Sequence, residues 1–133
     1  MTPFGAELRR IRAERGLTLK EMAAGLEVSP AYLSALEHGH RGRPSLHFVH
    51  AVCQYLGIIW DEAEALERLA ALSHPRVTID TAGLSPAATE LANRLSETVS
   101  TLPQERIDAL LSVMQEAEET AQARLDAGSQ ESN

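Results

Sequence analysis

The sequence contains little cysteine, few aromatic residues and no long apolar run. Its one cysteine, Cys53, excludes a disulfide framework and a zinc site built from several thiolates, and it suits a reducing compartment. Because there is no run of about 18 apolar residues and no apolar N-terminal segment, we expect a protein that is neither membrane-spanning nor secreted. Aromatic residues make up only 4% of the chain, which favours a helical core packed with leucine, alanine and valine. We therefore expect an all-α protein of the cytoplasm.

The sequence also lacks the signatures of catalysis and of metal binding. It has no nucleophile elbow, no glycine-rich phosphate loop and no paired-carboxylate motif, so we predict no enzymatic activity and no cofactor. His47, His50 and Cys53 recur at every third position. Three ligands on so short a stretch of helix have an awkward geometry, and a buried thiol in apolar surroundings is inert. A metal site and a redox-sensing thiol are therefore minor alternatives, and we predict neither.

Positive charge is scarce overall and unevenly distributed, within a formal net charge of −7. Residues 1–58 hold seven basic and five acidic residues together with four histidines. Residues 59–133 hold five basic and fourteen acidic residues. Such a division indicates that the two halves have different partners. The first half can face phosphate groups, whereas the acidic half has to point away from them.

Two short helical patterns lie between residues 16 and 45. In the first, Thr18 can cap a helix, and Glu21 three residues later completes a capping box. In the second, Ser29 is a favourable N-cap and Pro30 occupies the first helical position. Apolar residues recur at helical spacing in both patterns, namely Leu19, Met22, Ala23 and Leu26, then Leu33 and Leu36. Two short amphipathic helices joined by a tight turn are what a helix-turn-helix requires.

These residues belong to a longer pattern that resembles the xenobiotic-response-element family of bacterial and phage regulators, which are built like the lambda and Cro repressors. The resemblance covers residues 4–58 and runs from FGAELRRIRAERGLT through SPAYLSALEHG to RPSLHFVHAVCQYLGI. It implies a five-helix DNA-binding domain. Two positions depart from the family pattern. Glu27 stands in the turn where many members have glycine, and Leu19 stands where many have a glutamine that faces a phosphate.

The resemblance also implies which residues face DNA. The N-terminal part of the second helix of the pair enters the major groove, which places Pro30, Ala31, Ser34 and Ala35 toward the bases. None of these residues is an Arg, Lys, Asn or Gln that could read a base with two hydrogen bonds, so direct readout looks poor. Tyr32 has an alternative role, which is to pack against the helix before it. The full set of expected DNA-binding residues is Thr18, Lys20, Ser29, Pro30, Ala31, Tyr32, Ser34, Ala35, His38, His40, Arg41 and Arg43.

Most of the basic residues in the first half lie in two segments. In the loop HGHRGRPS at residues 38–45, Arg41 and Arg43 flank Gly42, whose backbone can approach DNA closely. We expect these two arginines to contact the DNA backbone or to enter a narrow minor groove, the alternative being an ordinary solvated loop. The other segment is a predicted helix over about residues 4–15. It carries Arg9, Arg10, Arg12 and Arg15, of which one or two can face DNA while the rest pair with Glu7 or Glu14.

The rest of the chain reads as further helices and one short strand. A fourth helix should begin at Ser45, and a fifth should run from about Trp60 to Leu72. The fourth helix is expected to bury Leu46, Val49, Val52, Cys53 and Leu56. We expect a DNA-binding domain over residues 1–73 and a linker over residues 74–85. The linker contains the alternating sequence RVTID at residues 76–80, which indicates a strand.

The C-terminal part of the chain predicts a dimer. Residues 86–126 form two amphipathic patterns, typical of a helical hairpin that bends near Pro103, and a disordered tail follows over residues 127–133. Two helices cannot cover both of their apolar stripes, so we expect a second copy to pack against them, with the two strands pairing across a twofold axis. The expected dimerisation residues are Val77, Ile79, Leu91, Leu95, Val99, Ile107, Leu111 and Met114.

From these observations we predict a sequence-specific DNA-binding transcriptional regulator associated with the nucleoid. Its simplest form is a dimeric repressor on an inverted-repeat operator, with double-stranded DNA and a second copy as its partners and a protein effector on its acidic half as a further candidate. One alternative is an antitoxin that binds a basic toxin and autoregulates its operon. The other is a protein-interaction module whose DNA binding is vestigial.

Overall fold

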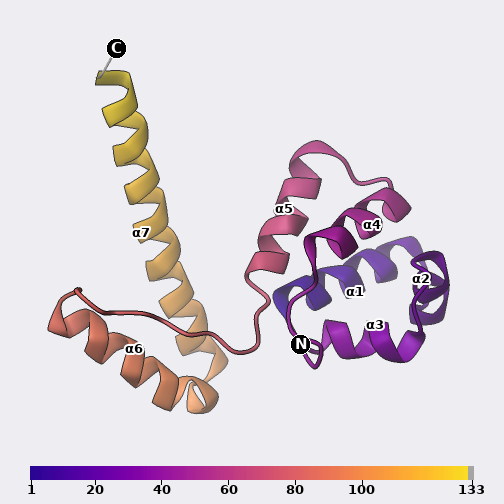
Figure 1. Ribbon diagram of the computed structural model, residues 1–133, viewed down its shortest axis with the longest axis horizontal. Coiled ribbons are helices and arrows are strands. Elements are labelled where there is room, and N and C mark those ends of the chain that lie inside the picture. The colour runs from indigo at the N-terminus through magenta and orange to yellow at the C-terminus, as the bar shows by residue number, and fades with distance from the viewer. Residues whose placement is uncertain (132–133) are drawn as a thin grey trace. The chain divides into compact units, whose positions relative to one another are not determined.

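The computed structural model describes residues 1–131, which form seven α-helices and one turn of 3₁₀ helix, with no β-strand in that range (Figure 1). The all-α class predicted from the sequence is confirmed. The helices fall into two compact units, Met1–Thr78 and a second unit that begins at Ile79.

The first unit contains the five helices that the sequence predicts. They are α1 (Pro3–Arg15), α2 (Leu19–Gly25), α3 (Pro30–Glu37), α4 (Leu46–Leu56) and α5 (Trp60–Ala71). The first four begin in the same way, because the hydroxyl of an N-cap residue accepts a hydrogen bond from the backbone N–H three residues later. These caps are Thr2, Thr18, Ser29 and Ser45. Each satisfies one unpaired donor at a helix start and contributes about 1 kcal/mol.

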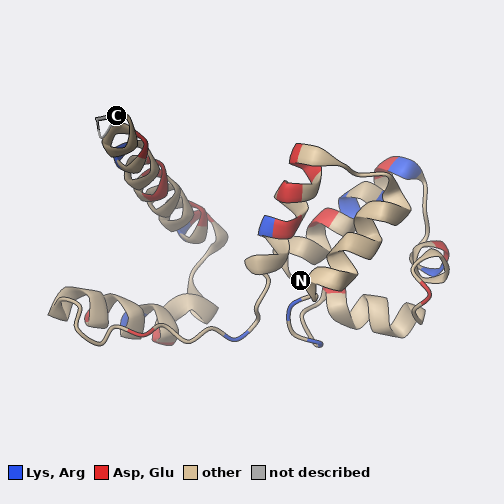
Figure 2. Ribbon diagram, turned by 45° about the horizontal axis from the view of Figure 1, so that its top comes forward, with Lys and Arg blue, Asp and Glu red and all other residues tan. Residues whose placement is uncertain are grey.

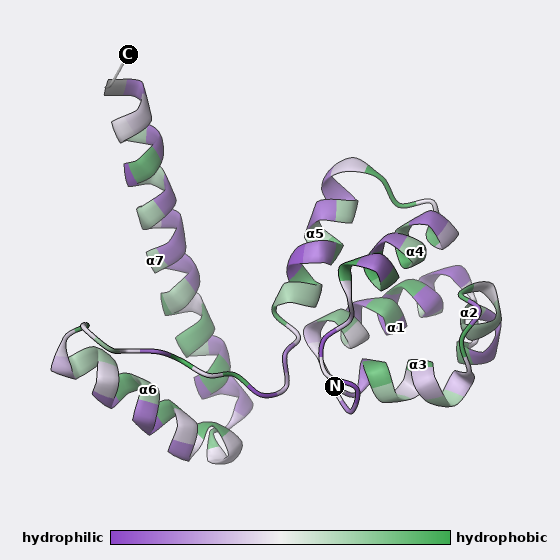
Figure 3. Ribbon diagram, in the orientation of Figure 1, coloured by the Kyte–Doolittle hydropathy of each residue, from purple (hydrophilic) through white to green (hydrophobic). Residues whose placement is uncertain are grey.

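A single hydrophobic core joins all five helices (Figure 3). Its fully buried members include Phe4, Leu8, Met22, Ala23, Leu33, Val49 and Val52. Leu46 departs from the expectation, since its side chain is 60% exposed instead of buried. It is the first residue of α4 and lies beyond the edge of the core, where it lines a groove with Arg43 and Glu67. The buried stripe of α4 therefore begins one turn later, at Val49.

A buried serine ties the end of α5 to the start of α1. The Ser73 hydroxyl accepts a hydrogen bond from the Phe4 N–H (2.9 Å) and donates one to the Leu69 carbonyl (2.6 Å). The hydroxyl is 69 positions from Phe4 in the sequence, so this contact closes the five-helix unit on itself. Residues after α5 are therefore part of the first unit's structure, and the unit extends past the end of its last helix.

The second unit consists of α6 (Pro86–Thr98), a 3₁₀ turn (Val99–Thr101) and α7 (Gln104–Glu131). The predicted bend is present, because Leu102 is extended before Pro103, as residues before proline prefer. The two helices diverge from this bend instead of packing along their lengths (Figure 1), so the predicted hairpin is not confirmed. No side chain in residues 79–130 is buried.

Two further expectations for the second half differ from the structure. The strand predicted at residues 76–80 is not confirmed, because residues 77–80 have no regular secondary structure. A strand needs a neighbour that pairs with its backbone groups, and residues 1–131 of one chain provide none. The sequence also predicts a disordered tail from Ala127 onward. In the structure α7 continues as far as Glu131, and residues 132–133 lie outside the described part of the chain.

The turn between α2 and α3 contains a strained residue. Glu27, one of the two departures from the family pattern, has a φ angle of 60°. This is the left-handed region, where the side chain of an L-residue crowds the backbone and glycine is preferred. The chain therefore holds a glutamate in a conformation that suits glycine better.

We predict that Glu27→Gly stabilises the first unit. Relief of the left-handed strain, roughly 1–2 kcal/mol, exceeds the roughly 0.5–1 kcal/mol that glycine loses through its more flexible unfolded state. Urea unfolding should therefore give an increase of about 0.5–1 kcal/mol in the free energy of unfolding.

A matched control is Gly16→Ala, because Gly16 has a similar φ of 67° and open space where a Cβ would be placed. This variant should be less stable by about 1 kcal/mol. Equal or lower stability of Glu27→Gly, with the expected loss at Gly16, would show that the turn is not strained at Glu27.

Candidate nucleic-acid interface

The recognition helix predicted from the sequence is α3, which lies along one side of the first unit with α2 before it (Figure 1). Leu33 and Leu36 are buried on its inner side. On its outer side Pro30 and Ala31 are exposed, while Ser34 is half-buried, as is Ala35. The outer surface of α3 carries no charged side chain, since its one charged residue, Glu37, is 2% exposed.

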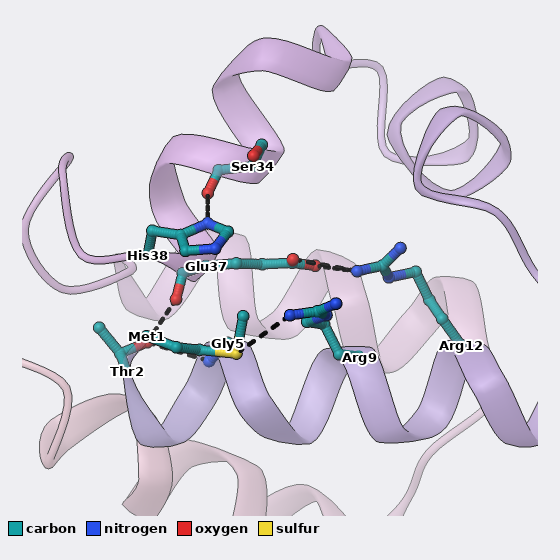
Figure 4. A network of polar contacts seen from close by, with 8 residues as sticks. All are labelled: Met1, Thr2, Gly5, Arg9, Arg12, Ser34, Glu37 and His38. Carbon is teal, nitrogen blue, oxygen red and sulfur yellow. Dashed lines mark hydrogen bonds and ion pairs between the residues drawn. The ribbon is translucent and has the colours of Figure 1, made fainter.

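Glu37 fixes the crossing of α3 over α1 (Figure 4). Its carboxylate accepts two hydrogen bonds from Arg12 Nη2, at 2.8 and 3.0 Å. Its backbone carbonyl accepts one from the Thr2 N–H at 3.0 Å and one from the Thr2 hydroxyl at 3.3 Å. A Cβ built on Gly5 would overlap this same carbonyl oxygen, so only glycine allows the two helices to approach so closely.

This ion pair was not predicted from the sequence, which had Arg12 either facing DNA or paired with Glu7 or Glu14. The Arg12 side chain is mostly buried, and its Nε atom has no hydrogen-bond partner within the described structure. The sequence does hold a signal for it. Arg12 lies four residues after the buried Leu8, and Glu37 lies four residues after the buried Leu33, so helical spacing turns both side chains inward.

The other arginines of α1 are also largely committed to contacts within the unit. Arg10 pairs with Glu7 and with Glu14, as the sequence predicts, and its hydrogen bond to Glu7 lowers the pKa of that carboxyl group. Arg15 donates to the Leu56 carbonyl at the end of α4, at 2.7 Å. The guanidinium of Arg9 lies 4.0 Å from the Met1 sulfur (Figure 4).

The loop after α3 folds back against it. Gly39 and Gly42 have φ angles of 82° and 75°, which let the chain reverse direction. The Arg41 Cζ atom lies 5.5 Å from the centroid of the Tyr32 ring. Tyr32 in turn packs edge-on against Phe48 of α4, with 6.3 Å between ring centroids. The aromatic partner of Tyr32 is thus on α4.

The remaining predicted DNA-binding residues lie beside these. Thr18 caps α2, and Lys20 is exposed on its first turn. In the loop, His38 Nδ1 is 2.8 Å from the Ser34 carbonyl, and the His38 ring stacks on that of His40. Arg43 is exposed and has no hydrogen bond, ion pair or ring contact within residues 1–131. Figure 2 shows α3 between α2 and this loop, with the arginines of the loop in blue.

The alternative sites considered for α4 have other roles in the structure. His50 Nε2 lies 3.2 Å from Glu67 Oε1, and no group of three or more His, Cys, Asp or Glu side chains in the described residues could hold a metal ion. Cys53 is buried in the core, and burial raises the pKa of its thiol, which disfavours the reactive thiolate. No helix of the described chain is long and apolar enough to cross a membrane.

Comparison with known proteins matches this architecture. Residues 3–67 match the family model of a helix-turn-helix domain. A transcriptional regulator of Sinorhizobium fredii, y4dJ, is 39% identical over 54 residues, which cover 41% of this chain and 69% of that protein. This chain belongs to the helix-turn-helix transcriptional regulators. It is a DNA-binding regulator of the xenobiotic-response-element type.

Two longer helix-turn-helix regulators are also similar. The regulator DdrOP3 of Deinococcus deserti is 43% identical over 61 residues, covering 45% of this chain and 46% of that protein. The repressor RghR of Bacillus subtilis is 36% identical over 61 residues, covering 46% of this chain and 45% of that protein. The chain therefore spans less than half the length of these two relatives. No solved structure gives a significant match.

The buried pair gives this regulator a pH-dependent stability. Burial raises the pKa of Glu37, and this effect outweighs the opposite effect of the Arg12 charge. The folded state therefore holds the Glu37 proton more tightly than the unfolded state does. The contribution of this group is fully present below its ordinary pKa of 4.5 and is lost as the pH rises through the raised value.

We predict that the free energy of unfolding of the wild type, minus that of Glu37→Gln, decreases as the pH rises from about 4 toward 7. Urea unfolding of both proteins at a series of pH values measures this difference, and most other titrating groups cancel in it. A difference that increases over the same range would mean that the attraction of Arg12 exceeds the effect of burial.

Proposed function

We propose that this regulator is a homodimeric repressor that binds an inverted-repeat operator, with α3 of each copy in the major groove. The observation that carries the proposal is the surface formed by α3 and the loop after it. Its outer side is uncharged, and the adjacent loop presents two arginines, Arg41 and Arg43, without a carboxylate partner. This arrangement suits a recognition helix, because it can enter a groove lined by phosphates without an exposed negative charge of its own.

Within this interface we assign the roles expected from the sequence to all of its residues except Tyr32 and Arg41. Pro30, Ala31, Ser34 and Ala35 face the bases, where the methyl groups of alanine can touch thymine methyls and the Ser34 hydroxyl can form one hydrogen bond. Contacts to the backbone position the protein along the duplex. The backbone-facing set is Thr18, Lys20, Ser29, His38, His40 and Arg43.

Dimerisation is supported by the second unit, in which no side chain of residues 79–130 is buried and most of the large apolar side chains are exposed. Leu91, Leu95 and Val99 of the second unit are exposed along α6 and the following turn, and Leu111 and Met114 are exposed along α7 (Figure 3). Helices of this kind gain most of their stability from packing an apolar face. A second copy supplies the same face across a twofold axis, with Val77, Ile79 and Ile107 at its margin.

We predict that Met114→Glu dissociates the dimer, because it places a charge among the apolar residues of the interface. Analytical ultracentrifugation at tens of micromolar should give a dimer for the wild type and a dissociation constant at least about tenfold larger for the variant, corresponding to about 1.4 kcal/mol.

The matched control is Val113→Glu. Val113 is as exposed as Met114 in the single chain, but it lies about 100° around α7 from the apolar stripe. Val113→Glu should remain a dimer. A monomeric wild type, or equal effects of the two substitutions, would contradict the proposed interface.

The DNA interface is tested with an operator selected from random duplexes by the full-length protein. We predict an inverted repeat with half-sites about one helical turn apart. Arg43→Ala should weaken binding to all duplexes and reduce the slope of log affinity against log salt by about 1. Ala35→Glu should abolish specific binding, since it adds a negative charge within the groove.

The control for Ala35→Glu is Ala65→Glu, at an exposed position of α5, which should bind as the wild type does. Circular dichroism should show that both variants are folded. Selection of a single half-site, or binding that survives Ala35→Glu, would count against the proposed mode of binding. Repression is then measured with the selected operator placed across a reporter promoter.

A further inference from the structure

The recognition helix of this regulator lacks the side chains that usually read bases. The positions of α3 that face outward hold proline, alanine and serine. None of these can form the paired hydrogen bonds by which Arg identifies guanine or Asn identifies adenine. Specificity then has two further sources, which are the shape of the operator and a donor that comes from outside α3.

Arg41 is the arginine that the structure brings to α3. Its guanidinium lies over the face of the Tyr32 ring, within the range of a favourable cation–π contact. Tyr32 is the third residue of α3, and the N-terminal part of a recognition helix is the part that contacts base edges. Arg41 is therefore held beside the base-facing surface even though it belongs to the loop.

The kind of contact also matters. An ion pair occupies the N–H groups at the edge of a guanidinium, as at Arg10 and Arg12. A contact with an aromatic ring takes up none of these N–H groups in a hydrogen bond, so they stay available to a ligand. Arg41 forms no ion pair and no hydrogen bond in the described structure, so its donors remain available.

The base of this stack is rigid. Tyr32 is half-buried and packs edge-on against Phe48, which itself packs against the hydrophobic core. An aromatic ring held in this way loses little further freedom on binding, which favours accurate placement of the arginine. Arg43, two residues along the same loop, has no such support.

We infer that Arg41 reads a guanine in the major groove of each operator half-site, and that Tyr32 is the residue that positions it. The inference rests on the proposed DNA-binding function. It gives different roles to the two loop arginines, for which the sequence predicted the same role. Arg41 recognises a base, while Arg43 neutralises a phosphate. The stack with Tyr32 compensates for the missing readers on α3.

The test uses the selected operator with single guanines replaced by 7-deazaguanine, which removes the N7 acceptor and leaves the phosphates unchanged. For the wild type, one guanine per half-site should be sensitive, with a loss on the order of tenfold in affinity for each replacement. Arg41→Lys keeps the charge but presents its donors on one nitrogen atom instead of a planar fork, so its loss of affinity on replacement should be clearly smaller than that of the wild type.

Three comparisons complete the test. Arg43→Lys should keep the full sensitivity of the wild type, as the matched substitution in the same loop. Tyr32→Phe retains the ring and should also keep it, whereas Tyr32→Leu should lose sensitivity at that guanine alone. A purely structural role of Tyr32 would lower affinity at all positions without changing which guanine is sensitive.

The outcomes separate this inference from the function on which it rests. If no operator is recovered, the proposed function fails and the inference fails with it. If an operator is recovered but the sensitive guanine is unchanged in Arg41→Lys, only the inference is overturned. A uniform loss in Arg41→Ala, with a salt slope smaller by about 1, would make Arg41 a phosphate contact and would also overturn it.

Discussion

The crossing of α1 and α3 is the constraint on which the rest of the first unit depends. At this crossing the Glu37 carboxylate meets Arg12, and the Glu37 carbonyl meets the Thr2 backbone and hydroxyl. Replacing a buried ion pair by apolar residues is often neutral, so such a pair is weak support for stability, whereas loss of one partner costs about 3–5 kcal/mol. Its contribution here is geometric. It sets the angle and the position at which the recognition helix leaves the core.

The arginines of the first unit differ in what their donors contact. Arg10, Arg12 and Arg15 use theirs within the unit, on carboxylates or on a backbone carbonyl. The loop arginines contact no carboxylate in residues 1–131. Net charge alone does not reveal this difference, because it counts all of these residues equally. A chain with a net charge of −7 can thus present a basic surface to DNA, if its positive groups on one side are left without internal partners.

Much of the first unit could be predicted from the sequence because its signals are local. Ser and Thr caps mark the starts of four helices, and the spacing of Leu8, Leu33 and Val52 identifies their inner faces. The features that were missed depend on distant partners. The inward turn of Arg12 has meaning only with Glu37, and the ring contact of Tyr32 depends on Phe48. Leu46 continues the apolar spacing of α4, but the core ends before it, and no local pattern records where a core ends.

For the second unit, the sequence predicted the helices and the bend between them but not how the helices pack. The sequence marks the start of α6 at Ser85 and Pro86 and the bend at Pro103, and both are present. It also suggested a strand and a closed hairpin, each of which requires a neighbouring surface to pair with. The described chain has no such surface for residues 77–80, and α6 and α7 diverge from one another. Predictions that depended on a partner are thus the ones that one chain does not bear out.

No side chain in residues 79–130 is buried, and this has a consequence for how assembly would depend on the amount of protein. If a second copy covers the apolar side chains of the second unit, this unit folds only when two chains associate. Its melting temperature then depends on protein concentration. The fraction of fully formed regulator then rises more steeply than the amount of chain in the cell. At low concentration, newly made chains would carry a folded DNA-binding unit attached to a second unit that is not yet packed against a partner. Occupancy of the operator would in that case rise steeply above a certain concentration of the protein, without a small-molecule signal.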